Sequence, residues 1–412
     1  MDIPIVIILI GLFIFWGHYL SRVFEKKGIP DVLGLMLIGL FLGPIFGLVD
    51  PASFGQFGPL FSHFVLIFIL FESGTELKFS EIKSSFKESA GITFIGFVTT
   101  WIIITSLCYI FFELDILSCL FIGATLGGTS SAVVVGLVRK IAVQPKTSTT
   151  LIIESAETDI FSLAIPLSIF TLMATGEMQT NLVISQFIAS LIFALLLGVI
   201  GAFLWSFIIN KFPDFKSTKF STPAFLFILY GIAEYLEASG PITALSFGVA
   251  IGNLKYLEPK IIERVIPNQS IVLPKEEREF FSEMVFLLRT FFFVFIGINI
   301  QMHRLDWVLW GALFTVVLYL ARIIIVKLVI QKNTPVLDKA VISIMIPKGL
   351  GAAVIATLPL YAGHADGEII QSICYAVILF STLYCTFLFI LLKKEITLPF
   401  YTFIFRRRLE PK

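Results

Sequence analysis

Three carboxylates occur within six residues of a long apolar segment, as Glu154, Glu157 and Asp159 in the run Glu-Ser-Ala-Glu-Thr-Asp. Residues 148–174 around them are otherwise apolar enough to lie in a bilayer. A charged side chain at the bilayer centre costs at least ~2.5–3.5 kcal/mol, so it is kept mainly where it faces a polar interior and serves an ion or a proton. The run therefore predicts a site that handles an ion or a proton.

One broad face of this helix carries four oxygen-bearing side chains, because successive residues on an α-helix are rotated by about 100°. Asp159 is about 16 Å along the helix from residue 148, which is near the middle of a bilayer. A hard alkali cation prefers several oxygen ligands, and one helix cannot supply them all. We therefore expect ligands from other segments beside this face, which comprises Glu154, Ser155, Thr158 and Asp159.

Two other apolar segments are interrupted by glycine and proline. Residues 123–131 read Gly-Ala-Thr-Leu-Gly-Gly-Thr-Ser-Ser, and residues 346–351 read Ile-Pro-Lys-Gly-Leu-Gly. Proline breaks helices, and unwound backbone is tolerated at bilayer depth only where it is buried in protein or lines a cavity. We expect both segments to be unwound, so that free carbonyls near Thr129 could coordinate a cation.

Composition identifies the class of protein. Of the 412 residues, 57% are hydrophobic and 14% are charged, and the mean hydropathy is +0.95, which excludes an ordinary soluble domain. A helix needs about 20 apolar residues to cross the hydrocarbon core. On that template we predict an all-α integral membrane protein with roughly 13 transmembrane helices, near residues 3–22, 30–48, 57–76, 90–113, 115–138, 148–174, 182–209, 221–236, 240–254, 280–301, 305–330, 337–361 and 366–392.

The basic residues alternate between successive loops, as a multi-pass topology requires. Most of the 30 Lys and Arg residues fall in loops on one side, whereas Arg304 is in an opposite loop and Arg289, Arg322 and Lys348 lie within spans. Because basic loops face the cytoplasm, we expect a cell-membrane protein with its amino terminus outside and its carboxyl terminus in the cytoplasm. The two interrupted segments then run in opposite directions, which is the arrangement of inverted-topology repeats around a midplane site.

The predicted spans make one transmembrane domain of residues 1–412, with no stretch long enough for a separate soluble domain. The four cysteines, Cys108, Cys119, Cys374 and Cys385, lie in apolar spans without metal-ligand spacing, so we expect neither disulfides nor a zinc site. No nucleic-acid-binding patch, no cofactor and no enzymatic activity are predicted. The lipid bilayer is the expected environment.

These segments together resemble the monovalent cation/proton antiporter family, the sodium/proton exchangers with an inverted-repeat membrane fold. Residues 154–159 are similar to the Glu-Ser-x-x-Asn-Asp signature of its electroneutral branch. Residues 127–131 resemble the unwound part of its ion-site helix, and residues 346–352 resemble the Pro-Arg-Gly-type segment of its other crossed helix. Weaker similarities occur at residues 71–74, 239–241, 248–250 and 291–297.

The resemblance implies that Asp159 exchanges a proton for Na⁺, or for Li⁺ or K⁺. With one exchangeable carboxylate, we expect one cation per proton and no net charge movement. The resemblance implies that Ser155 and the carbonyl of Thr129 complete the shell of the monovalent cation, and that the remaining contributors are Thr158, Ser130 and Glu72. It also implies an ion pair between Glu154 and Lys348, a homodimer and a part in pH homeostasis.

Three positions depart from the family pattern. Ser130 stands where many electroneutral relatives carry an acid, Thr158 replaces Asn, and Lys348 replaces Arg. The missing acid at Ser130 weakens the field that favours small Na⁺, so K⁺/H⁺ exchange is the nearest alternative. From other classes, a passive cation channel would conduct without proton counterflow, and a non-transporting scaffold would tolerate neutralisation of Asp159.

Overall fold

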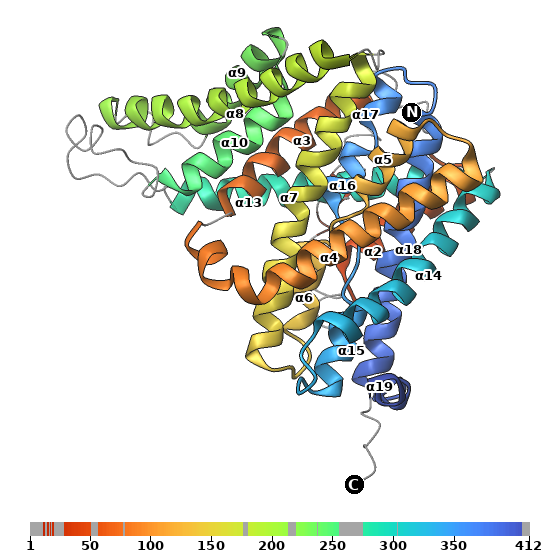
Figure 1. The fold of residues 1–412 in the computed structure, drawn as a ribbon. Helices are drawn as coiled ribbons and strands as arrows, with labels where there is room; N and C mark the ends of the chain where they lie inside the picture. The colour runs from red at the N-terminus through yellow and green to blue at the C-terminus, as the bar shows by residue number, and fades with distance from the viewer. Residues whose placement is uncertain are drawn as a thin grey trace. The chain divides into compact units, whose positions relative to one another are not determined.

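The computed structural model describes residues 29–50, 57–76, 79–175, 180–212, 220–236, 238–254, 275–302 and 304–405, together with Gly11, Leu12, Phe15, Gly17 and Tyr19. Within these ranges the ordered elements are helices, and strands are absent (Figure 1). The all-α prediction is therefore confirmed. The predicted first span, residues 3–22, lies largely outside the described residues.

The helices follow the predicted spans closely, and the two spans with Gly and Pro signals are each divided into separate helices. Their bounds are α2 Asp31–Leu40, continued by the π-helical turn η1 Phe41–Ile45, α3 Phe57–Glu76, α4 Phe79–Phe112, α5 Ile116–Thr125, α6 Ser131–Val138, α7 Pro145–Thr175, α8 Thr180–Lys211, α9 Ser221–Tyr235, α10 Gly240–Gly252, α13 Lys275–Ile298, α14 Leu305–Val329, α15 Val336–Ile344, α16 Leu350–Ile355, α17 Leu358–Tyr361, α18 Gly367–Lys393 and α19 Leu398–Phe405.

Six segments of the described helices are long and apolar enough to cross a membrane. They are residues 91–112, 145–173, 192–211, 279–298, 305–329 and 367–393. Shorter apolar helices cover residues 31–45, 60–75, 116–125, 240–252 and 350–361. Several of these shorter elements coincide with predicted spans that the structure interrupts or shortens.

The chain divides into two compact units. Unit 1 comprises Met1–Gly55, Ser85–Ser162 and Thr290–Lys412, and unit 2 comprises Gln56–Ser84 and Leu163–Arg289. The prediction that the whole chain makes one transmembrane domain stays a prediction.

Unit 2 is built around α10, which packs against α3 and α8. Glycines allow these helices to approach closely, as small residues do in membrane helix pairs. A Cβ atom added at Gly248 would collide with the backbone of Phe71 on α3, and one added at Gly198 on α8 would collide with Ser246 on α10. The contact between these helices is therefore made by backbone as well as side chains.

Unit 1 contains the carboxylate run and both interrupted helices. In Figure 1, α5 lies above α6 whereas α15 lies below α16, so the two interrupted helices run in opposite directions. Next to them α14 packs along α18, where a Cβ atom at Gly311 would collide with Ala376. The antiparallel arrangement of the two broken helices agrees with the prediction from the loop charges.

Candidate functional site

The first interruption separates α5, which ends at Thr125, from α6, which begins at Ser131. Its two glycines are packed too tightly for any side chain. A Cβ atom at Gly128 would collide with the side chain of Ser162 and with the carbonyl oxygen of Thr158, both on α7, and one at Gly127 would collide with the ring of Phe97 on α4. The predicted unwinding is confirmed, and the glycines allow the unwound segment to lie directly against α7.

The second interruption lies between Ile344, the end of α15, and Leu350, the start of α16. Its carbonyl at Pro347 accepts a hydrogen bond of 2.7 Å from the backbone N–H of Ser130, in the first interruption. The backbone N–H of Lys348 donates to the hydroxyl of Ser381 on α18 at 3.0 Å. One backbone hydrogen bond thus joins the two interruptions, and α18 supplies a partner for a further N–H group, as buried backbone requires.

The Lys348 side chain is 1% exposed, and its Nζ donates a hydrogen bond of 3.0 Å to the carbonyl oxygen of Gly128. The last carbonyls of a helix carry partial negative charge and lack helical partners. Lys348 therefore places a hydrogen-bond donor just beyond the carbonyl end of α5, on the unwound segment.

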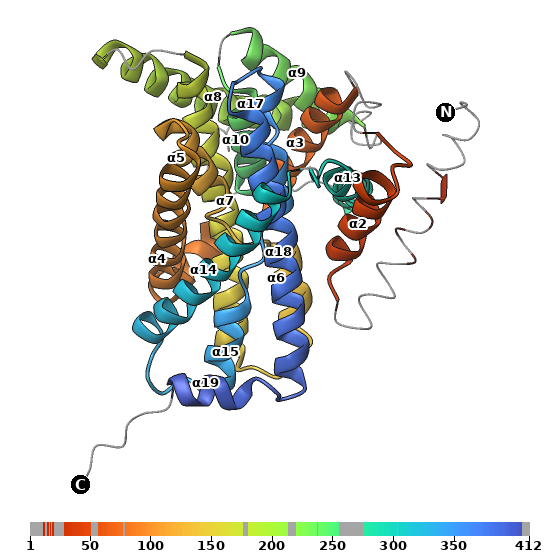
Figure 2. The ribbon, with the colours of Figure 1, turned by 90° about the vertical axis from the view of Figure 1, so that its right-hand side faces the viewer.

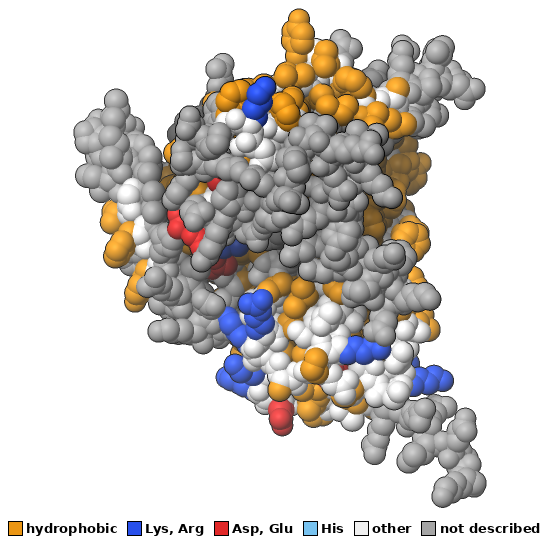
Figure 3. Space-filling view, turned by 90° about the vertical axis from the view of Figure 1, so that its left-hand side faces the viewer, with side chains coloured by type: hydrophobic (Ala, Val, Ile, Leu, Met, Phe, Trp, Pro, Cys, Tyr) orange, Lys and Arg blue, Asp and Glu red, His pale blue; other side chains and the backbone are white. Residues whose placement is uncertain are grey.

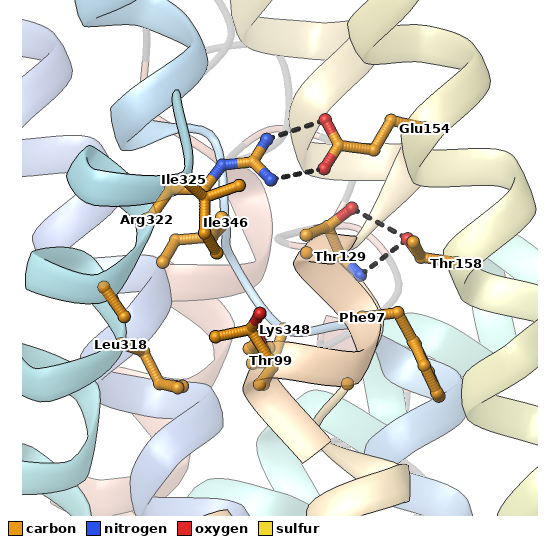
Figure 4. Close-up of a pocket in the computed structure, with 14 residues that line it drawn as sticks. Phe97, Thr99, Thr129, Glu154, Thr158, Leu318, Arg322, Ile325, Ile346 and Lys348 are labelled. Atoms are coloured by element: carbon orange, nitrogen blue, oxygen red, sulfur yellow. Dashed lines mark hydrogen bonds and ion pairs between the residues drawn. The ribbon is translucent and has the colours of Figure 1, made fainter. Parts of the chain in front are cut away.

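Two residues of the carboxylate run contact the first interruption and the start of α6. The hydroxyl of Thr158 accepts from the Thr129 backbone N–H at 3.1 Å and lies 3.0 Å from the Thr129 hydroxyl (Figure 4). The half-buried Asp159 accepts a hydrogen bond of 3.1 Å from the backbone N–H of Ser131, at the first residue of α6. A helix amino terminus favours negative charge, so this contact stabilises the ionised carboxylate.

The other predicted ion ligands occupy different surroundings. Ser155 is buried on α7, and its hydroxyl donates to the carbonyl of Ile152 at 2.9 Å, which leaves lone pairs on the oxygen. Ser130 is buried beside Gly349, where an added Cβ atom would come within 3.3 Å of it. Glu72 lies on α3, in unit 2. The parts of Ser155, Ser130 and Glu72 in ion binding stay predictions.

The structure corrects the predicted partner of Glu154. Its carboxylate pairs with Arg322 of α14, with nitrogen–oxygen distances of 2.6 Å and 2.7 Å, and both side chains are almost fully buried (Figure 4). The predicted pair of Glu154 with Lys348 is therefore wrong. The planar guanidinium can donate two parallel hydrogen bonds to one carboxylate, which an ammonium cannot do.

The surroundings of Arg322 fit a guanidinium. Its Nε donates to the carbonyl of Ile342 on α15 at 3.1 Å. On α4, Gly96 leaves room for the side chain, since a Cβ atom there would lie 2.9 Å from the Nη1 atom of Arg322. The pair thus connects α7, α14 and α15 beside the second interruption.

A small cavity in unit 1 adjoins these groups. Its volume is about 10 Å³, which is room for about one water molecule. Asp159 is not among the residues that line it. The polar side chains that line it are Thr99, Thr100, Thr129, Glu154, Thr158, Arg322 and Lys348.

The packing of the first interruption can be tested with Gly128→Ala. We expect this variant to lose about 1–3 kcal/mol of stability, because a methyl group must displace Ser162 or the backbone of α7. The measurement is the thermal midpoint and monodisperse yield of the purified protein in detergent. The matched control is Gly136→Ala on α6, where an added Cβ atom meets nothing within 4 Å. Equal midpoints for the two variants would contradict the described packing.

Comparison with known proteins identifies the family of this chain. The family described as "Sodium/hydrogen exchanger, transmembrane" matches residues 6–394. The chain is 26% identical over 302 residues to the probable Na(+)/H(+) antiporter 2 of Methanocaldococcus jannaschii, a match that covers 70% of this chain and 68% of that protein. It is 24% identical over 241 residues to the K(+)/H(+) antiporter NhaP2 of Shewanella oneidensis, and here the match covers 57% of this chain but only 41% of the relative.

Among solved structures, that of the sodium proton antiporter MjNhaP1 from Methanocaldococcus jannaschii at pH 8 has the same fold. The TM-score is 0.72 at 20% sequence identity, and the match covers 100% of both chains. The match to the family extends over almost the entire 412 residues. The chain therefore belongs to the family of transmembrane sodium/hydrogen exchangers.

Proposed function

We propose that this chain exchanges Na⁺ for H⁺ across a cell membrane as a secondary active transporter, and that the two ions compete for Asp159. The observation that carries the proposal is the position of this carboxylate, whose Oδ2 accepts from the N–H of Ser131 where α6 begins after the unwound segment. A carboxylate beside a broken helix offers a hard oxygen ligand next to backbone that is not committed to helical hydrogen bonds.

The other oxygens of the cation shell come from the same two elements. Thr129 and Thr158 are already in hydrogen-bond contact, so the unwound segment and α7 present their oxygens together. We assign the carbonyl of Thr129 and the hydroxyls of Ser155 and Thr158 to the shell, with Ser130 as a neighbouring contributor. All of these are the oxygen donors that alkali cations prefer.

Glu154 is a poorer exchange group than Asp159. Its carboxylate is paired with the buried guanidinium of Arg322, and protonating it would leave that charge uncompensated, which is strongly unfavourable. Lys348 is likewise engaged with the Gly128 carbonyl. Exchange at Asp159 alone replaces one cation by one proton, and such a cycle moves no net charge.

The expected orientation follows from the loop charges. Lys and Arg residues gather in the loops of one side, which supports a multi-pass protein with its amino terminus outside and its carboxyl terminus in the cytoplasm. A homodimer is proposed from the family resemblance alone.

Exchange can be measured in proteoliposomes that contain a pH-sensitive dye. We expect addition of Na⁺ or Li⁺ outside to drive proton movement, whereas K⁺ drives less, and we expect clamping of the membrane voltage to leave the rate unchanged. A rate that follows the clamped voltage would contradict electroneutral exchange. Cation uptake without proton counterflow would instead indicate a passive channel.

K⁺/H⁺ exchange is the second candidate. Ser130 supplies no charge where many electroneutral relatives carry an acid, and the NhaP2 relative of Shewanella oneidensis is named a K(+)/H(+) antiporter. In the same proteoliposomes, a faster response to K⁺ than to Na⁺ would favour this candidate.

A further inference from the structure

The end of α18 redirects the chain sharply into α19. The backbone N–H of Ile396 donates to the carbonyl of Leu391, and that of Glu395 donates to the carbonyl of Leu392, both at 2.9 Å. Glu395 has a φ of 60°, and this combination is the Schellman motif that ends many helices. As a result α19 lies crosswise to α18 (Figure 2).

The two faces of α19 differ. Tyr401 is only 3% exposed, and α19 packs against α15. On other sides of the helix, Phe400 is 54% exposed and Phe403 is 85% exposed. Eight residues of helix extend about 12 Å, too short to cross a bilayer. A short crosswise helix with exposed aromatic side chains, attached to the end of a helix long enough to cross a membrane, is typical of an element that lies in the membrane interface.

Basic residues flank this helix in the sequence. Lys393 and Lys394 are exposed at the end of α18, and the exposed Glu395 lies between them and α19, which begins at Leu398. Arg406, Arg407 and Arg408 follow α19 in the sequence. Figure 3 shows Lys and Arg side chains gathered at the lower end of the molecule, the end at which Figure 1 places α15 and α19.

The loop between α6 and α7 contributes to the same end. The buried carboxylate of Asp338 on α15 accepts from the Gln144 backbone N–H at 3.1 Å and from the Thr147 hydroxyl at 2.6 Å. These contacts bring Arg139 and Lys146, both exposed, to the end of unit 1 that carries the start of α15. Basic clusters directly beyond a membrane helix attract anionic lipid.

We propose that α19, with Lys393 and Lys394 before it, is a docking surface for anionic phospholipids of the adjacent leaflet. Phe400 and Phe403 enter the boundary between headgroups and acyl chains, and the lysines bind the headgroup phosphates. Lipid is favoured over a soluble partner because the exposed aromatic side chains lie beside basic ones at the end of a membrane-spanning helix. Because α19 packs on α15, lipid bound at α19 also anchors α15 to the leaflet. α15 leads into the second interruption, which contains Lys348.

A fluorescent label at position 403 tests this surface. All four native cysteines are buried, at 0% exposure, so Phe403→Cys in the full chain can be labelled selectively. The labelled protein is reconstituted with phosphatidylcholine and phosphatidylglycerol, one of which is brominated on its acyl chains. We expect stronger quenching by brominated phosphatidylglycerol than by brominated phosphatidylcholine at equal mole fraction. The preference for phosphatidylglycerol should fall in high salt. It should also fall roughly fivefold for each charge removed, in Lys393→Gln and in Lys394→Gln.

The control is a label at Asn333→Cys, an exposed position in the loop before α15, where quenching should be weak and equal for both lipids. Equal quenching by the two lipids at position 403 would overturn recognition of charge. Absence of quenching there would overturn entry of α19 into the leaflet. The readout involves no transport, so it does not depend on the proposed exchange.

Discussion

Asp159→Asn is expected to reduce cation-driven proton movement in proteoliposomes to the level of empty vesicles. Asparagine keeps the size of the side chain and can still accept from the Ser131 N–H, but it cannot bind and release a proton. It also removes the negative charge that attracts the cation. Both halves of the exchange should therefore fail together, for Na⁺ and for Li⁺.

The measurement needs a control that removes a carboxylate elsewhere. Asp306→Asn is suitable because Asp306 is exposed and pairs with the exposed Arg304 at 3.3 Å, an interaction of small energetic value. We expect this variant to transport at the wild-type rate. If Asp159→Asn retained exchange while it remained folded, competition for this carboxylate would be excluded and the scaffold interpretation would gain support.

Arg322→Met is expected to destabilise the protein by about 3–5 kcal/mol, because it leaves the buried carboxylate of Glu154 without its partner. Glu154→Gln should cost a similar amount, since the guanidinium then lacks its counter-charge. The measurement is the thermal midpoint in detergent, together with the yield of monodisperse protein. The effect should be large because both side chains are almost fully buried, where water cannot replace the lost partner.

The double variant Glu154→Gln with Arg322→Met should recover most of that loss, because removing both charges leaves neither unpaired. The informative comparison is Glu154→Gln with Lys348→Met. In the structure Lys348 bonds to the carbonyl of Gly128, so its removal should add a further loss. If Lys348→Met recovered the stability lost in Glu154→Gln and Arg322→Met did not, Glu154 would pair with Lys348, as predicted from the sequence.

The positions of both helix interruptions could be predicted because helix breaking is local. Gly127 and Gly128 in one span, and Pro347 and Gly349 in the other, have weak helix propensity wherever they stand. The same holds for the spans themselves, which follow from runs of apolar residues. The short helix α19 was not predicted, because its eight residues are too few to be detected as a span and follow directly after one.

The partner of Glu154 could not be predicted in the same way. Three basic residues lie within the predicted spans, namely Arg289, Arg322 and Lys348. A buried charge needs a counter-charge, so each of them was a possible partner of Glu154. The choice among them depends on which helices are neighbours, and residues 154 and 322 are far apart in the sequence. The amino-acid sequence thus determined the membrane class, the broken helices and the carboxylate run through local composition. The tertiary structure alone decided that Arg322 pairs with Glu154 and Lys348 with the Gly128 carbonyl, because such contacts depend on long-range packing.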